Sequence, residues 1–324
     1  MQTAACPGNR DHHHSYCPGI RAYFVLSRQG YPPSQRRYES LHAGGRQTPV
    51  RQVMRRFIAI SLALLLGTGL HAQQDPTAAL LDSLVLNYVS AIQPESVETK
   101  QGECDFLIGS VRDSLMRRQI AVSLFNYYRN APVMGDEAVA IYVFDKWFAS
   151  GRMNFPGEFE KLDAEMFCNM NRNTLLGMDA PVLKARRPCG GRIMVPVKDG
   201  TTLLWFYDTA CSKCRVEAKV LPSVLEQSVD FPITLVAFYS GQSRKDWREF
   251  RRNFRVANRN LKIVHCWDPQ VESDYLRLYG VISTPKMYMV APEGSIIGCR
   301  LEVESLQQLM PTAREINELF CKKR

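Results

Sequence analysis

One short segment in the second half of the chain constrains the fold more than any other. Residues 203–207 (LLWFY) are a run of large apolar side chains typical of a buried strand, and a short loop leads from them to Cys211 and Cys214. The two cysteines are three residues apart at the start of a helical pattern, so they share one face of its first turn. The sequence therefore predicts a strand, a loop and a helix whose N-terminus carries two thiols.

The position of Cys211 has a chemical consequence. A helix N-terminus offers free amide donors and a partial positive charge, which stabilise a thiolate and lower the pKa of the thiol. The charges of Lys213 and Arg215 act in the same direction. Cys214, one turn further along, is placed to attack a mixed disulfide on Cys211 and release the substrate.

Short β-branched or aromatic runs alternate with helical patterns from about residue 190 onward. The predicted order is βαβαβαββα, with strands at 203–207, 233–239, 263–266, 286–290 and 296–300 and helices at 212–227, 243–257, 272–279 and 305–320. A short hairpin at 193–197, with Lys198, Asp199 and Gly200 as its turn, precedes these elements. Such alternation predicts an α/β fold in which helices cover both faces of a central sheet.

Pro285 stands at the start of the strand predicted at 286–290. Proline cannot donate a hydrogen bond within a sheet, so we expect it at the strand entrance, where a cis peptide after Thr284 is compatible with the pattern.

The first half of the chain has a different pattern. Between residues 77 and 173 apolar side chains recur at intervals of three and four, which predicts four or five helices. We expect a small all-α domain at 73–176. Its aromatic residues are interpreted as helical core: Tyr142, Phe144, Trp147 and Phe148.

Residues 54–72 have the composition of a secretory signal peptide. Arg55 and Arg56 precede the apolar run 57–66, and small residues follow up to Ala72. The apolar run is shorter than the ~20 residues that span a membrane. We expect residues 1–53 to be a non-native or disordered upstream extension and the mature chain to begin at Gln73. The alternative is a cytoplasmic tail before a signal anchor.

The net charge of +9 is concentrated in the first 72 residues, and only +2 remains over 73–324. The net charge of residues 73–324 therefore gives little support to the hypothesis of a nucleic-acid partner. Of six histidines only His265 remains after residue 72, which excludes a zinc site built on several histidines.

Eight cysteines follow residue 72, and an exported protein can form disulfides. Two pairs are candidate structural disulfides, with free thiols as the alternative: Cys104 with Cys168, and Cys299 with Cys321. The pairing of Cys189 and Cys266 is left open. A zinc site at Cys211 and Cys214 would need Cys266, His265 or Cys189 to complete it, and the chain has no second C-x-x-C.

Four segments together resemble the thioredoxin superfamily: WFYDTACSKC, HCWDP, YGVISTPKMYMV and APEGSI. They resemble in particular its periplasmic TlpA-like branch of the Bacteroidetes type, which places a helical domain before the thioredoxin-like one. The resemblance spans 177–324 and implies a thioredoxin-like mixed sheet. It also implies a thiol-disulfide oxidoreductase with Cys211 as nucleophile and Cys214 as resolving thiol. The Thr284-Pro285 loop would pair with the substrate backbone and keep metals off the thiols.

The sequence departs from the family pattern near the cysteines. Trp205 stands where thioredoxin has a buried aspartate, so Asp208 and Glu217 are the candidates for proton transfer with Cys214. Ser212 and Lys213 replace the familiar Gly-Pro, which leaves the reduction potential open.

The resemblance implies an exported, periplasmic enzyme that exchanges disulfides with other exported proteins, more as a reductase than as an oxidant. It implies no small cofactor, no metal and no nucleic acid, and a membrane-bound thiol reductant as redox partner. The alternative is a binding module in which the C-x-x-C is a structural disulfide.

Overall fold

A computed structural model of the 324-residue chain describes residues 76–131, 133–198 and 200–322. These residues form two compact units that divide between Leu175 and Leu176. The predicted signal peptide at 54–72 and the segment before it lie outside the described residues. In the part of the chain that is described, no helix is both long and apolar enough to cross a bilayer.

The first unit consists of helices, as expected. Its elements are α4 (Pro76–Ala91), α5 (Val97–Gly109), α6 (Ser114–Arg129), α7 (Glu137–Val143), the π-helix η1 (Phe144–Ala149) and α8 (Glu158–Asn171). Side-chain caps fix where two of these helices begin, because Ser96 accepts from the Thr99 amide and Asp113 from the Met116 amide.

The core of the first unit contains an ion pair. The Lys100 ammonium lies 2.6 Å from Asp136, and both side chains are 2% exposed. Charges without water are costly unless they are paired, so the two groups depend on each other.

The aromatic prediction for this unit is correct in part. Phe144 and Phe148 are buried and pack around Phe155. Tyr142 and Trp147 are only half-buried, and both donate hydrogen bonds to Asp105, at 2.5 and 3.0 Å. They therefore hold α7 and η1 to α5 through a carboxylate.

The second unit is an α/β domain with one seven-stranded mixed sheet. Its elements are β1 (Leu183–Arg186), β2 (Arg192–Val195), β3 (Thr201–Tyr207), α9 (Ser212–Ser228), β4 (Ile233–Tyr239), α10 (Arg244–Asn253), β5 (Leu261–Trp267), α11 (Tyr275–Leu278), β6 (Lys286–Val290), β7 (Ile296–Gly298) and α12 (Val303–Lys322). The strand order is β2-β1-β5-β4-β3-β6-β7. Strands β3, β4 and β5 are parallel, and the other pairings are antiparallel. From β3 onward the predicted order βαβαβαββα is confirmed.

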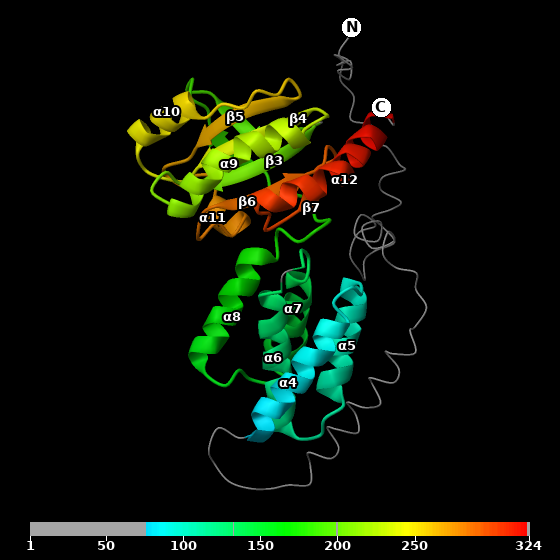
Figure 1. Cartoon of the computed structure of the whole chain (residues 1–324). Helices are drawn as coiled ribbons and strands as arrows, with labels where there is room; N and C mark the ends of the chain where they lie inside the picture. Colours follow the sequence, from blue (N-terminus) through cyan, green and yellow to red (C-terminus); the bar gives the residue numbers. More distant parts are fainter. Residues whose placement is uncertain (1–75, 132, 199, 323–324) are drawn as a thin grey trace, which may run out of the picture. The chain divides into compact units, whose positions relative to one another are not determined.

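Helices cover both faces of this sheet (Figure 1). Every residue of β3 is buried. Because neighbouring residues of a strand point to opposite faces, Trp205 contacts Phe250 and Phe254 around α10, whereas Phe206 contacts Tyr275 of α11. Burial on both sides explains why β3 is continuously apolar.

Two local predictions are wrong. The hairpin at 193–197 does not pair with β3. Strand β2 pairs with β1 at the far edge of the sheet, and the half-exposed β1 has too little apolar pattern to be found from sequence. The helix expected at 272–279 is only Tyr275–Leu278, because Asp268 accepts the amides of Glu272 and Ser273 and holds them in a loop.

Candidate active site

The two cysteines lie where β3 gives way to α9. Cys211 is the N-cap residue of α9, and its sulfur accepts a hydrogen bond from the Cys214 amide at 3.2 Å. Cys211 is half-buried, while Cys214 is 2% exposed. The arrangement therefore offers one sulfur to a partner and keeps the other beneath it, as the spacing predicts.

The environment of Cys211 favours its thiolate. Partial burial alone would raise the pKa of this thiol, but hydrogen bonds outweigh it and lower the pKa below its ordinary value. They come from the side chain and amide of Cys214, the side chain of Thr284 and the amide of Lys213. A lowered pKa increases the fraction of thiolate, the form that attacks disulfides.

Cys214 has the opposite character. Burial raises the pKa of its thiol to about 12, although the Asp208 amide donates to its sulfur at 3.5 Å and partly counters this. Cys214 is therefore protonated at neutral pH and needs a base before it can act as a nucleophile.

Glu217 is a base in the appropriate place. It lies one helical turn after Cys214 on the buried face of α9, where side chains three residues apart are neighbours. The side chain is 7% exposed, and burial raises the pKa of its carboxyl to about 7. The indole of Trp205 lies beside this carboxyl and partly lowers its pKa, yet Glu217 Oε2 makes no hydrogen bond within the described residues.

The polar residues that flank the cysteines mainly fix the loop. The Lys213 ammonium pairs with Glu302 at 3.0 Å, so Lys213 acts on Cys211 through its amide. Asp208 accepts from the Ala210 amide at 2.9 Å, so its carboxylate holds the loop. Arg215, expected to act through charge, donates to the carbonyls of Thr209 and Ala210 at 3.2 and 3.1 Å.

The Thr284-Pro285 loop meets the active-site helix. The Thr284–Pro285 peptide bond is cis. The Cys211 thiol donates to the Thr284 carbonyl at 3.2 Å, and the Thr284 side chain bonds both sulfurs. Four predicted site residues are thus brought together: Cys211, Cys214, Thr284 and Pro285.

The other cysteines lie outside this site. Cys104 and Cys168 are free, buried thiols, so no disulfide joins them in the structure. Cys299 is buried and Cys321 exposed, and their pairing stays a prediction.

The geometry disfavours the zinc alternative. His265 and Cys266 are neighbours in β5, so they point to opposite faces of the sheet. Residues 76–322, as far as they are described, contain no cluster of three or more metal-ligating side chains.

Comparisons with known proteins place the fold. No protein-family model and no curated protein matches the sequence. A thioredoxin-like protein from Bacteroides caccae matches with a TM-score of 0.60 at 14% identity, over 83% of this chain and 97% of that one. The thioredoxin domain of a thiol-disulfide oxidoreductase from Bacteroides vulgatus matches at 20% identity over 44% of this chain and 97% of its own (TM-score 0.37). A thiol:disulfide interchange protein from a Bacteroides species matches at 20% identity over 45% and 92% (TM-score 0.35).

The match to the Bacteroides caccae structure covers too much of the chain to be confined to one unit. The chain therefore has a thioredoxin-like fold with a helical domain before it, as the resemblance implied.

Proposed function

We propose that this protein is a thiol-disulfide oxidoreductase that works mainly as a reductase of disulfides in other exported proteins. One observation carries the proposal. A half-buried Cys211 with a lowered pKa is the N-cap of α9, and a buried Cys214 with a raised pKa lies in the first turn of the same helix.

In the first step the Cys211 thiolate attacks one sulfur of a substrate disulfide. A new S–S bond forms between Cys211 and the substrate, and the other substrate sulfur leaves as a thiolate that takes a proton from water. The lowered pKa of Cys211 supports this step, because it increases the fraction of thiolate, the form that attacks.

In the second step Cys214 resolves the mixed disulfide. The Glu217 carboxylate takes the Cys214 proton, and the Cys214 sulfur attacks the Cys211 sulfur. The second substrate sulfur leaves as a thiolate, which takes a proton from water. Two electrons pass to the substrate and the Cys211–Cys214 disulfide forms. A carboxyl with a pKa of about 7 is half-ionised near neutral pH, which suits it to both release and uptake of a proton.

Renewed turnover needs an external dithiol, and we assign this role to a membrane-bound thiol reductant. Export rests on the sequence of residues 54–72 alone. N-terminal sequencing of the mature protein tests it, with Gln73 as the expected first residue.

The reductase proposal is tested with residues 73–324, which contain every described helix and strand. Reduced protein should reduce insulin disulfides, and Cys211→Ser should abolish the activity. Cys189→Ser is the matched control, because Cys189 is an exposed thiol of the β1–β2 loop, and it should keep full activity. Equal activity in the Cys211→Ser variant would reject the proposal.

The rival function is a binding module with a permanently oxidised C-x-x-C. It predicts that Cys211 stays unreactive toward alkylating reagents after mild reduction, whereas the lowered pKa of Cys211 predicts rapid alkylation at neutral pH.

A further inference from the structure

The charge of the chain is divided unequally between its two units. Residues 73–175 contain nine Lys and Arg against 14 Asp and Glu, a net charge of −5. Residues 176–324 contain 23 Lys and Arg against 16 Asp and Glu, a net charge of +7. The net charge of residues 73–324 is therefore close to neutral only because an acidic unit and a basic unit offset each other. The basic character of the chain is not confined to its first 72 residues.

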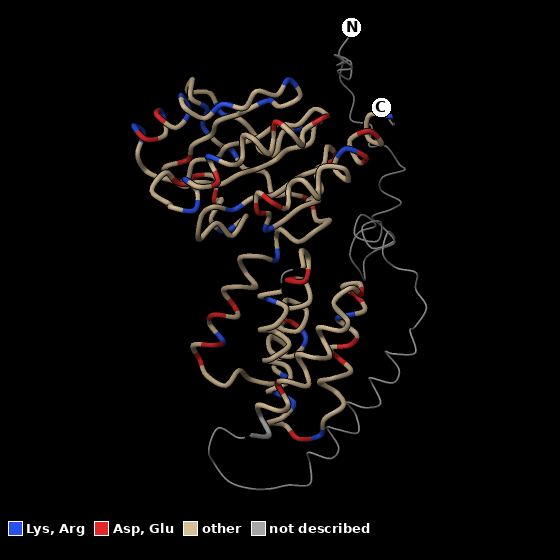
Figure 2. Tube along the Cα trace, in the orientation of Figure 1, with Lys and Arg blue, Asp and Glu red and all other residues tan. Residues whose placement is uncertain are grey.

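Much of this positive charge lies along α10. At 3.6 residues per turn, four arginines fall within a sector of roughly 100° on this helix: Arg244, Arg248, Arg251 and Arg252. The acidic residues of α10, Asp246 and Glu249, lie outside that sector. Figure 2 shows Lys and Arg along α10, together with its two acidic residues.

The neighbouring strands extend the charge. Arg186 of β1 is in register with Trp267, whose ring contacts Trp247 of α10, so Arg186 lies on the α10 side of the sheet. Lys184 shares that side, since it is two residues away, and Arg192 is paired with Arg186. We call these three residues and the four α10 arginines the basic face.

The β1–β2 loop, which connects Arg186 to Arg192, lies near α10. The pKa of the exposed Cys189 thiol, in the β1–β2 loop, is lowered by a hydrogen bond from the Gly191 backbone and by the charges of Arg187 and Arg251. Arg251 belongs to α10, so the loop lies close to that helix.

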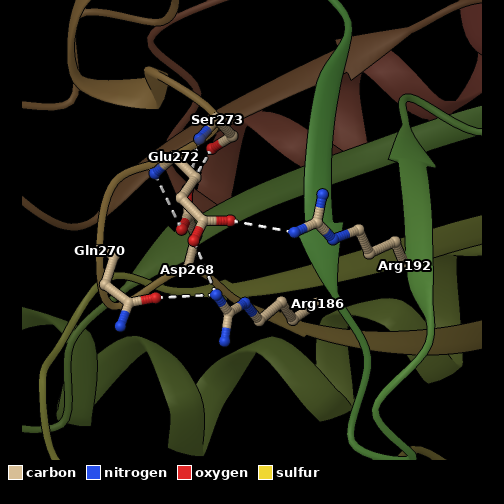
Figure 3. Close-up of polar contacts among 6 residues, drawn as sticks. All are labelled: Arg186, Arg192, Asp268, Gln270, Glu272 and Ser273. Atoms are coloured by element: carbon tan, nitrogen blue, oxygen red, sulfur yellow. Dashed lines mark hydrogen bonds and ion pairs between the residues drawn. The ribbon is translucent and has the colours of Figure 1, made fainter.

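Few acidic groups neutralise the basic face. Arg186 and Arg192 both converge on Glu272, so two cations share one carboxylate (Figure 3). Within the described residues, the side chains of Arg244, Arg248 and Arg252 form no ion pair or hydrogen bond. Like charges four residues apart on a helix are destabilising, so the fold itself gains nothing from Arg244 beside Arg248 or Arg248 beside Arg252.

We propose that the basic face binds the anionic headgroup surface of a phospholipid bilayer. Guanidinium groups match phosphate geometry and bind it with two parallel hydrogen bonds. The face also carries an apolar side chain, because Met194 is paired with Lys184 and is 49% exposed. Cations with an exposed apolar side chain among them suit a lipid interface better than a uniformly polar partner.

Two features support a membrane-bound orientation. An anionic bilayer attracts the basic second unit and repels the acidic helical one. The basic face lies on α10 and the β1–β2 strands, whereas Cys211 begins α9. None of the seven residues of the basic face belongs to α9 or to the Thr284-Pro285 loop.

The test is sedimentation of residues 73–324 with vesicles of phosphatidylcholine alone or with 30% phosphatidylglycerol. We expect binding only to the anionic vesicles, with affinity that falls as salt rises from 0.1 to 0.5 M. A triple variant, Arg244→Gln, Arg248→Gln and Arg252→Gln, should bind on the order of 100-fold more weakly. Its circular dichroism and insulin reduction should equal those of the wild type.

The matched control removes three exposed charges elsewhere in the same unit: Lys198→Gln, Lys219→Gln and Lys262→Gln. It should retain binding within about threefold, since these residues lie outside the basic face. Equal loss in both triple variants would mean that net charge alone acts and would overturn the proposal. The proposal would also be overturned if the wild-type protein did not bind anionic vesicles. This holds equally if the protein binds poly-glutamate or DNA instead.

A second measurement shows which surface of the protein contacts the bilayer. Anionic vesicles should protect Cys189 from a bulky maleimide, measured at that peptide by mass spectrometry, because its loop adjoins the basic face. Binding without protection of Cys189 would assign the contact to another surface. These results are independent of the reductase proposal, which fails or succeeds on insulin reduction.

Discussion

The buried carboxyl of Glu217 makes a quantitative prediction about stability. Folding raises the pKa of this carboxyl from 4.5 to about 7. The folded protein therefore binds more protons than the unfolded chain between these pH values. Because proton binding and folding are linked, the stabilisation that the protonated Glu217 carboxyl provides is fully present below about pH 4.5. It is lost as the pH rises to about 7. This difference in pKa between the folded and unfolded states corresponds to about 3 kcal/mol in the free energy of unfolding.

Glu217→Gln removes the titration while it keeps the shape of the side chain. The variant should have a stability close to the wild type near pH 4.5, and an advantage that grows to about 3 kcal/mol at pH 7.5 and then levels off. Urea unfolding of the reduced protein at half-unit pH intervals measures this difference. Glu318→Gln, which removes an exposed carboxylate from α12, is the control and should show no such trend. A difference between Glu217→Gln and wild type that does not change with pH would refute the reasoning.

Three further predictions concern other contacts. Cys214→Ser should trap substrates in a mixed disulfide visible on non-reducing gels, because the resolving thiol is gone; free substrate would contradict this. Lys213→Gln should change the alkylation rate of the active-site thiol less than twofold, because the ammonium is already paired with a glutamate; a large decrease would restore a direct role for its charge. Lys100→Met leaves Asp136 charged and buried and should cost about 3–5 kcal/mol in chemical denaturation. Lys161→Met, in an exposed pair, should cost less than about 1 kcal/mol, and equal losses would refute the argument.

The sequence predicts the central elements of the second unit well. Strands β3 and β4 are buried on both faces, so continuous apolar runs mark them. The cysteines are equally readable, because three-residue spacing at a helix start places them on one face of the first turn. Strand β1 is missed, because its residues alternate between buried and exposed positions over only four residues.

Side-chain partners at the site were less predictable. The sequence suggests Glu217 as a proton carrier, but its burial beside Trp205 depends on how α9 packs on the sheet. Lys213 and Arg215 are adjacent to the thiols in sequence, yet one pairs with Glu302 and the other with loop carbonyls. Neither the long-range ion pair of Lys213 nor the loop contacts of Arg215 leave a periodic pattern in the sequence. The sequence of α10 contains the arginines of the basic face, but only the structure brings them near β1 and β2.

The reduction potential of the Cys211–Cys214 pair tests the central claim most directly. Residues 73–324 would be equilibrated in glutathione or dithiothreitol buffers, and free thiols would be counted after alkylation. The account predicts reversible exchange, with a potential near that of thioredoxin, roughly −270 mV, for a reductase. A value near −120 mV would keep the exchange chemistry but make the protein an oxidant. A pair that does not exchange, or that resists reduction well below about −300 mV, would contradict the account and make the disulfide structural.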